Sequence, residues 1–87
     1  MTAETLLEFP CDLPIKVFGK NVAGFRSRVV DIVSLHVDLV SDDQVREQFS
    51  RNNGYASLTI TFRAESREQV DALFEDLTAT EEIMMVL

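Results

Sequence analysis

Between Asn53 and Ala64 the chain reads N-G-Y-A-S-L-T-I-T-F-R-A. From Tyr55 onward apolar and polar side chains alternate strictly, and β-branched and aromatic residues are frequent, which is typical of a strand with one buried face. We therefore expect Tyr55–Ala64 to lie in the middle of a sheet. The face turned toward the helices is predicted to carry Ala56, Leu58, Ile60 and Phe62.

The segment before this strand, Val45–Asn52, is predicted to be its hairpin partner. Asn53-Gly54 accepts the positive φ angles of a two-residue turn, so the chain should reverse there. The apolar residues of both strands then share one face, as the register requires. This register pairs Asn52 with Tyr55, Phe49 with Leu58 and Val45 with Phe62.

Glu47 interrupts the apolar face of Val45–Asn52, because this register places it inward, opposite Ile60. An inward-pointing charge on an outer strand opposes edge-to-edge aggregation. We therefore expect Val45–Asn52 to be an edge strand.

Upstream, the sequence predicts a short strand followed by a helix. Pro10 and Pro14 exclude a helix between them, and Ile15–Gly19 is predicted to be the strand. Asn21 is the expected N-cap of a helix over Val22–His36; a loop over Asp38–Asp43 follows. The helix has an apolar stripe at helical spacing, made of Val22, Phe25, Val29, Ile32, Val33 and His36.

Downstream, a second helix and a last strand are predicted. Ser66 and Gln69 have the spacing of a capping box, so the helix should begin after Ser66 and run to about Leu77. The apolar run Ile83–Leu87 is the expected last strand. The buried stripe of the helix is predicted to be Val70, Leu73, Phe74 and Leu77.

These elements predict an α+β fold, the ferredoxin-like βαββαβ sandwich. Its four-stranded antiparallel sheet would have the order 4-1-3-2, with both helices on one face. Residues 1–9 are expected to form an N-terminal leader, and residues 10–87 one domain.

Composition narrows the function classes. The net charge of −7 disfavours nonspecific binding to nucleic acid or anionic lipid. The single cysteine, Cys11, excludes an internal disulfide, which favours a reducing, cytoplasmic location. No stretch has the length or the apolar character of a signal peptide or a membrane span.

The predicted topology leaves two surfaces uncovered. One is the face of the sheet without helices, the open face, which is polar with a basic tendency. The other is the uncharged edge of the last strand, which invites pairing with another chain. The candidate interaction residues are Lys16, Phe18, Tyr55, Thr59, Arg63, Met84 and Met85.

Several stretches together resemble the YbeD-like family of small bacterial proteins of unknown function. They follow one another over nearly the whole chain. They comprise Leu6–Pro10, Lys16–Gly19, His36, Ser50, Tyr55–Thr61, Glu68–Val70 and Met85–Leu87. The resemblance implies a ferredoxin-like fold similar to the ACT regulatory domains of amino-acid enzymes, and it implies no established activity.

The loop between the first strand and the first helix is the candidate ligand site. ACT domains bind small ligands there, usually as dimers, through a loop rich in Asp, Pro and Gly; this loop has neither Asp nor Pro. Its ending Gly24-Phe25-Arg26 also resembles the phosphate cradle of acylphosphatases, where backbone N–H groups and an arginine bind the anion. The candidate anion-binding residues are Gly19, Lys20, Asn21, Gly24 and Arg26.

Two further features are candidate sites. Asn53–Leu58 faintly resembles the core motif of an RNA-recognition module, but Tyr55 is its one stacking aromatic. His36, the only histidine, lacks neighbouring metal ligands in sequence. We expect it to interact with the last carbonyls of the first helix.

We predict a non-enzymatic, cytoplasmic regulatory or protein-interaction module without cofactor, metal or catalytic residues. Its partner would be another protein or a second copy in a homodimer, with a small-molecule effector as a further option. The alternatives are an acylphosphatase-like hydrolase acting through Gly19–Arg26 and a weak RNA-binding module acting through the open face.

Overall fold

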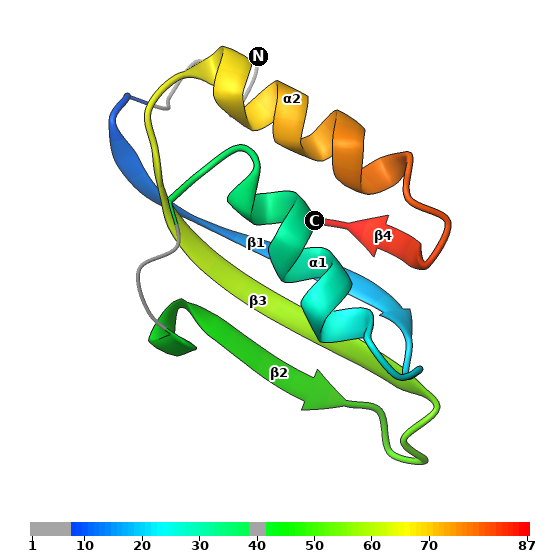
Figure 1. Cartoon of the computed structure of the whole chain (residues 1–87). Helices are drawn as coiled ribbons and strands as arrows, with labels where there is room; N and C mark the ends of the chain where they lie inside the picture. The colour runs from blue at the N-terminus through cyan, green and yellow to red at the C-terminus, as the bar shows by residue number, and fades with distance from the viewer. Residues whose placement is uncertain (1–7, 39–41) are drawn as a thin grey trace.

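Tyr55–Ala64 forms the long inner strand β3. In the computed structural model, which describes residues 8–38 and 42–87, β3 pairs antiparallel with β1 (Cys11–Lys20) on one side and with β2 (Val45–Phe49) on the other. β4 (Ile83–Val86) pairs antiparallel with the other side of β1, so the sheet order is β2-β3-β1-β4 (Figure 1). This is the predicted order 4-1-3-2 read from the opposite edge, with β2 at an edge as expected.

The alternation of β3 determines which of its side chains are buried. Ala56, Leu58, Ile60 and Phe62 are each between 0% and 3% exposed. Ile15 and Val17 of β1 add to the same layer, while Lys16 and Phe18 lie on the opposite face. The hydrophobic core therefore sits between this face of the sheet and the helices.

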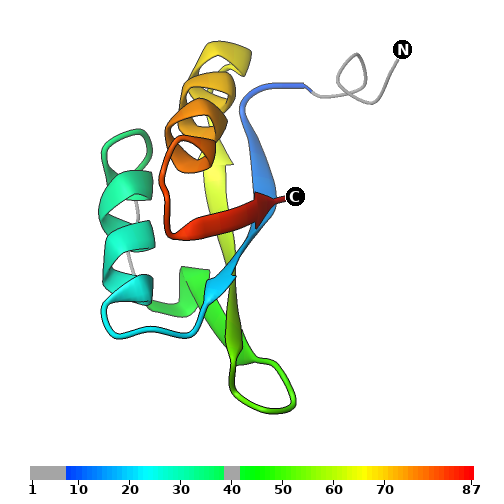
Figure 2. The same cartoon turned by 90° about the vertical axis from the view of Figure 1, so that its right-hand side faces the viewer.

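Two helices cover that face, as Figure 2 shows edge-on: α1 (Phe25–Ser34) and α2 (Arg67–Thr78). The predicted stripes are confirmed for most positions. In α1 the buried residues are Phe25, Val29, Ile32 and Val33; in α2 Leu73 and Leu77 are buried, with Val70 and Phe74 half-buried against the core.

The predicted start of the first helix was wrong. α1 begins at Phe25, because Gly24 has φ +85°, which an α-helix cannot contain. Val22, predicted as part of the buried stripe, is exposed before the helix. Asn21 does not cap α1, since its side-chain amide donates to the carbonyl of Asn53 at 2.8 Å.

The predicted N-cap Ser66 of α2 is confirmed, and Gln69 reaches back one residue farther than a capping box requires. The Ser66 Oγ accepts a hydrogen bond from the backbone N–H of Gln69 at 3.1 Å. The side chain of Gln69 reaches back, and its Oε1 accepts from the backbone N–H of Glu65 at 2.7 Å. The first bond satisfies a donor that a bare helix start would leave unpaired, and the second holds the residue before the N-cap.

β1 is longer than the predicted Ile15–Gly19, because Pro14 is tolerated within it. Lys16 exchanges both backbone hydrogen bonds with Leu87, on the β4 side of the strand. Residues two apart direct their backbone groups to the same side. The missing N–H of Pro14 therefore faces the β4 side, where pairing has not yet begun, and no ladder bond with β3 is lost.

The two-residue hairpin turn was also wrong, and with it the register. β2 ends at Phe49, which lies opposite Ala56 instead of Leu58, a shift of two residues. Ser50 and Tyr55 close a four-residue loop: the Ser50 N–H donates to the Tyr55 carbonyl, and the Tyr55 N–H donates to Ser50 Oγ. A shift of two preserves the face of every side chain, so the buried set is unchanged.

Asn52 stabilises this loop through its side chain. Its Oδ1 accepts from the N–H of Gly54 at 3.0 Å and from the hydroxyl of Ser50 at 3.1 Å. Asn53 takes the left-handed conformation with φ +60°, which asparagine tolerates better than most residues.

Two predicted segments lie partly outside the described residues. Of the leader 1–9, residues 1–7 lie outside them, and Phe9 packs against the core. Of the loop Asp38–Asp43, residues 39–41 lie outside them; Asp42–Gln44 forms the short 3-10 helix η2 before β2.

Candidate functional site

The outer edge of β4 is one of the two surfaces predicted from the sequence. β4 pairs with β1 only, so within residues 8–38 and 42–87 no strand occupies its other side. Leu87 directs its backbone groups to Lys16, so the neighbouring Val86 directs its own away from β1. Met84, Met85 and Leu87 are 60%, 49% and 64% exposed. The edge therefore combines unpaired backbone groups with exposed apolar side chains.

An apolar strip, made of Phe18, Met85 and Leu87, continues from this edge onto the open face. Met85 lies directly opposite Phe18, and Leu87 exchanges backbone bonds with Lys16, so their side chains share that face. Met84 is skipped where the β1–β4 register shifts. Met84 and Met85 were predicted together as interaction residues. The structure places Met85 in this strip and leaves Met84 out of it. Leu87, which also belongs to the strip, was not predicted.

The other predicted surface residues lie on the central strands. Tyr55 is half-exposed at the hairpin end of β3 and, with Phe18, lines a small hollow of about 170 Å³. Thr59 lies in mid-strand, and Arg63 near the far end pairs with Asp12 of β1 at 3.4 Å. All of them lie on the open face, as predicted.

A polar trench occupies the middle of the open face. It has a volume of about 440 Å³ and lies across β1, β3 and β2. Asp43 of η2 stands at one end of it. The other lining residues are Lys16, Gln44, Arg46, Gln48, Thr59 and Thr61.

The predicted anion loop, Gly19–Arg26, is engaged by neighbouring elements. The backbone and side-chain N–H groups of Asn21 donate to the carbonyls of Gly54 and Asn53, which ties the loop to the hairpin. The guanidinium of Arg26 lies 3.6 Å from the carboxylate of Glu47 on β2. This pair also explains the inward charge on β2: Glu47 meets a cation from α1. Anion binding by Gly19, Lys20, Asn21, Gly24 and Arg26 stays a prediction, with Arg26 already paired.

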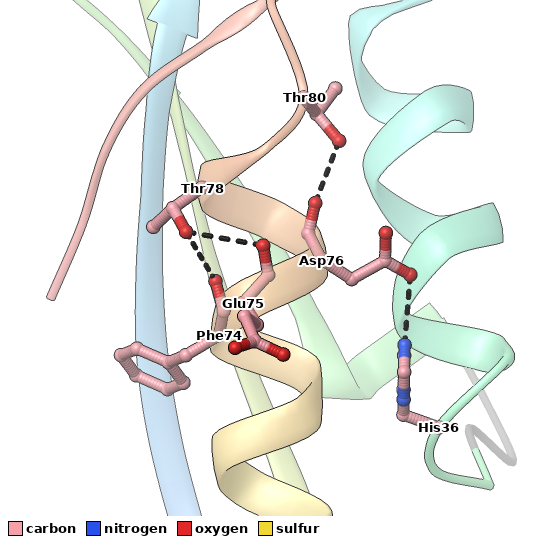
Figure 3. Close-up of polar contacts among 6 residues, drawn as sticks. All are labelled: His36, Phe74, Glu75, Asp76, Thr78 and Thr80. Carbon is pink, nitrogen blue, oxygen red and sulfur yellow. Dashed lines mark hydrogen bonds and ion pairs between the residues drawn. The ribbon is translucent and has the colours of Figure 1, made fainter.

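His36 does not bind the last carbonyls of α1, contrary to expectation. Its Nε2 lies 2.9 Å from Oδ2 of Asp76 on α2, and its side chain is 21% exposed (Figure 3). Its backbone carbonyl accepts a hydrogen bond from Nε2 of Gln69 at 2.9 Å. His36 therefore joins the end of α1 to α2.

Sequence reasoning missed Asp76 because it is 40 residues from His36. Figure 3 shows Thr80 beside this pair; its hydroxyl donates to the backbone carbonyl of Asp76 at 3.0 Å. Nothing in the local sequence distinguishes Asp76 from the other acids of α2.

Across the described residues there is no group of three or more His, Cys, Asp or Glu side chains arranged to hold a metal ion. None of the described helices has both the length and the apolar character needed to cross a membrane.

Comparison of the fold with solved structures identifies ACT domains as neighbours. The ACT domain from GTP pyrophosphokinase of Chlorobium tepidum aligns with a TM-score of 0.71 at 10% identity, covering 90% of this chain and 96% of that chain. The H. pylori protein HP0495 aligns with a TM-score of 0.69 at 10% identity, covering 93% of this chain and 85% of that one. At such identity these likenesses show the fold alone.

Comparison of the sequence identifies relatives of nearly the same length. A UPF0250 protein of Nitrosomonas europaea is 41% identical over 87 residues and is covered in full by this chain. One from Paraburkholderia phytofirmans is 39% identical, with 97% of this chain and 94% of the relative covered. A family model described as "Protein of unknown function (DUF493)" matches residues 4–87. The chain therefore belongs to this bacterial YbeD-like family, DUF493 or UPF0250, whose fold is that of the ACT domains.

Proposed function

We propose that this protein is a non-enzymatic regulatory module of the cytoplasm that works as a homodimer, joined through the outer edge of β4. The observation that carries the proposal is this edge, where unpaired backbone groups of an outer strand lie beside exposed Met84, Met85 and Leu87. An exposed apolar edge strand is a template for pairing with another chain.

The geometry favours a twofold arrangement. If β4 of one copy pairs antiparallel with β4 of another, the same residues meet from both sides, and the contact closes without leaving a free copy of itself. The two sheets would then continue as one. ACT-like neighbours and a family without an assigned activity are compatible with a regulatory role.

β4 alone is too short to hold a stable dimer. Its four residues span only ~13 Å at ~3.3 Å per residue, whereas stable interfaces bury on the order of 1,200 Å² or more in total. The apolar strip of Phe18, Met85 and Leu87 adjoins the edge and would supply the additional contact area.

Light scattering after size exclusion, over a series of protein concentrations, tests the proposal. The native chain is expected to have the mass of a dimer, and Met85→Lys that of a monomer, because a charge would be buried in the interface. Leu35→Lys is the matched control: Leu35 is 78% exposed near the end of α1, away from β4, so this variant should stay dimeric. A native chain that is monomeric at the highest concentration, or a Met85→Lys variant that dimerises as well as the control, contradicts the proposal.

The two alternative functions have less support. A hydrolase at Gly19–Arg26 would need Arg26 to leave Glu47. An RNA-binding face would need stacked aromatics on the central strands, where Phe18 and Tyr55 are the available rings and the trench between Lys16 and Arg46 is lined by none.

A further inference from the structure

Two cations flank one threonine across the open face. Thr59 of β3 lies directly opposite Lys16 of β1 on one side and Arg46 of β2 on the other. The three residues therefore form a row across the sheet. Among the described residues, the side chains of Lys16 and Arg46 make neither a hydrogen bond nor an ion pair, whereas Arg63 on the same face is paired with Asp12.

This row crosses the polar trench, which is longer than a pocket for a single ion. A second hollow of about 380 Å³ adjoins it and shares Asp43, Gln44 and Thr61. Together the hollows follow β3 from Thr59 to Arg63, a length of ~13 Å at ~3.3 Å per residue. At the hairpin end, Gln48 also lines the hollow that contains Phe18 and Tyr55.

One wall of the trench is held in place by a long-range hydrogen bond. The side-chain amide of Gln44 donates to the backbone carbonyl of Thr61 at 3.1 Å, which fixes η2 against β3. Asp43 is the one acid among the described residues that line the trench, and it stands at the η2 end. The positive part of the trench is therefore the middle, between Lys16 and Arg46.

Lys16 and Arg46 lie on the face of the sheet opposite a predominantly acidic helix. The net charge is −7, and α2 with its flanking loops is predominantly acidic. Cations on one face of an otherwise acidic molecule attract negatively charged groups to that face, while the acidic helix repels them. The shape of the trench suits an extended chain, whose groups can hydrogen-bond with the threonine and glutamine side chains along it.

We propose that this trench binds an extended, acidic peptide segment of a partner protein, with its carboxylates between Lys16 and Arg46. The trench adjoins the β4 edge, because Lys16 exchanges backbone hydrogen bonds with Leu87, but peptide binding in it does not require the dimer. The guanidinium of Arg46 binds a carboxylate through two parallel N–H groups, and the ammonium of Lys16 binds as a point charge. Asp43 repels carboxylates at its end, so the acidic residues of the segment are confined to the middle of the trench.

Single-stranded RNA is the competing polyanion, and the lining residues disfavour it. Binding of single strands relies on bases stacked on aromatic rings. The Lys16–Arg46 row itself holds no aromatic ring; Phe18 lies in the next row of the sheet, with Ser57 and Gln48, and Tyr55 lies farther toward the hairpin. A peptide carboxylate needs no ring and fits the row of cations and hydroxyls.

The test is fluorescence anisotropy of a labelled glutamate-rich peptide titrated with the full chain at low salt. The double variant Lys16→Gln with Arg46→Gln should weaken binding by about tenfold or more, because both charge-assisted contacts are lost. The matched control is Lys20→Gln with Arg51→Gln, which removes the same charge outside the trench and should weaken binding by less than about threefold. Light scattering on the same samples checks that the variants keep the native mass, which separates this result from the fate of the β4 dimer.

Three outcomes overturn the proposal. One is no binding of the glutamate-rich peptide to the native chain. Another is an equal loss in both double variants, which would indicate attraction to overall charge instead of to the trench. The third is tighter binding of a labelled oligouridine than of the peptide, which would assign the trench to nucleic acid.

Discussion

Gly19 and Gly24 are required for different physical reasons. A Cβ on Gly19 would lie 2.3 Å from the ring of Phe25 and 2.6 Å from the backbone oxygen of Glu82. The absence of a side chain there lets α1 and the approach to β4 pack closely against β1. Gly24 has no atom within 4 Å of its would-be Cβ, but its φ of +85° is strained for a residue with a side chain.

We expect Gly19→Ala to lower the free energy of unfolding by about 1–3 kcal/mol, because the added methyl overlaps a ring and a backbone atom. Urea denaturation measures the change. Gly54→Ala is the control: its nearest atom is the side-chain oxygen of Asn52 at 3.2 Å, so its loss should be smaller. A Gly19→Ala variant as stable as the Gly54→Ala variant would show that α1 can shift away from β1 freely.

At the scale of elements, the contact between the two helices depends on a few polar groups. Gln69 donates to the carbonyl of His36 and accepts from Glu65, while Asp76 holds the imidazole of His36. Gln69 thus both caps α2 and binds the backbone just after α1. These bonds join segments that are far apart in sequence, so they contribute to the orientation of α1 against α2.

A double-mutant cycle on His36→Ala and Asp76→Ala should give a coupling energy of about 0.5–1.5 kcal/mol, as expected for a half-buried hydrogen bond. The same cycle on Arg28 and Glu82, an exposed pair at 4.0 Å, should give less than about 0.5 kcal/mol, because solvent screens exposed charges. Thermal or urea unfolding of the variants supplies both energies. Equal couplings would mean that His36 and Asp76 do not hold the helices together.

Across the whole molecule, charge is separated between two faces. The open face carries Lys16 and Arg46, and the helix side, seen edge-on in Figure 2, carries the acids of α2 and its flanking loops. Like charges one helical turn apart, such as Asp71 and Glu75, repel each other and weaken the folded state. Repulsion among these acids therefore lowers the free energy of unfolding that burial of the core provides.

We expect Glu75→Lys to raise the free energy of unfolding by about 0.2–0.5 kcal/mol at low salt, because it replaces a repulsion with an attraction to Asp71. The new cation would also lie near the C-terminal end of α2, where the helix dipole favours positive charge. Thermal unfolding at low and high salt measures the effect. Glu75→Gln should give a smaller gain, and added salt should reduce both gains; a gain independent of salt would exclude an electrostatic cause.

The elements with strong periodicity could be predicted, and their ends could not. The alternation in Tyr55–Ala64 correctly identified the buried face and the central place of β3. The loop after Phe49 was misjudged because Ser50 and Asn52 bind the backbone through their side chains, which competes with the two-residue turn. The start of α1 was misjudged because a single backbone angle at Gly24 excludes the helix.

The candidate sites, too, could be predicted only in part. That Lys16, Thr59 and Arg46 would share a face follows from the two-residue repeat of a strand, and this repeat holds even when the register moves by two. The sequence did not show which cations would form ion pairs. Arg26 meets Glu47 and Arg63 meets Asp12 through contacts between separate elements.

Local features could therefore be predicted from the sequence alone. They are the strand and helix patterns, the N-cap of α2, the topology and the edge at Ile83–Leu87. These features depend on backbone geometry and on neighbours within a few positions along the chain. The pairing of His36 with Asp76, the tie between Asn21 and the hairpin, and the trench lined by Lys16 and Arg46 arise only on folding. They depend on side chains brought together from distant positions, and no local pattern encodes which of several similar charges will meet.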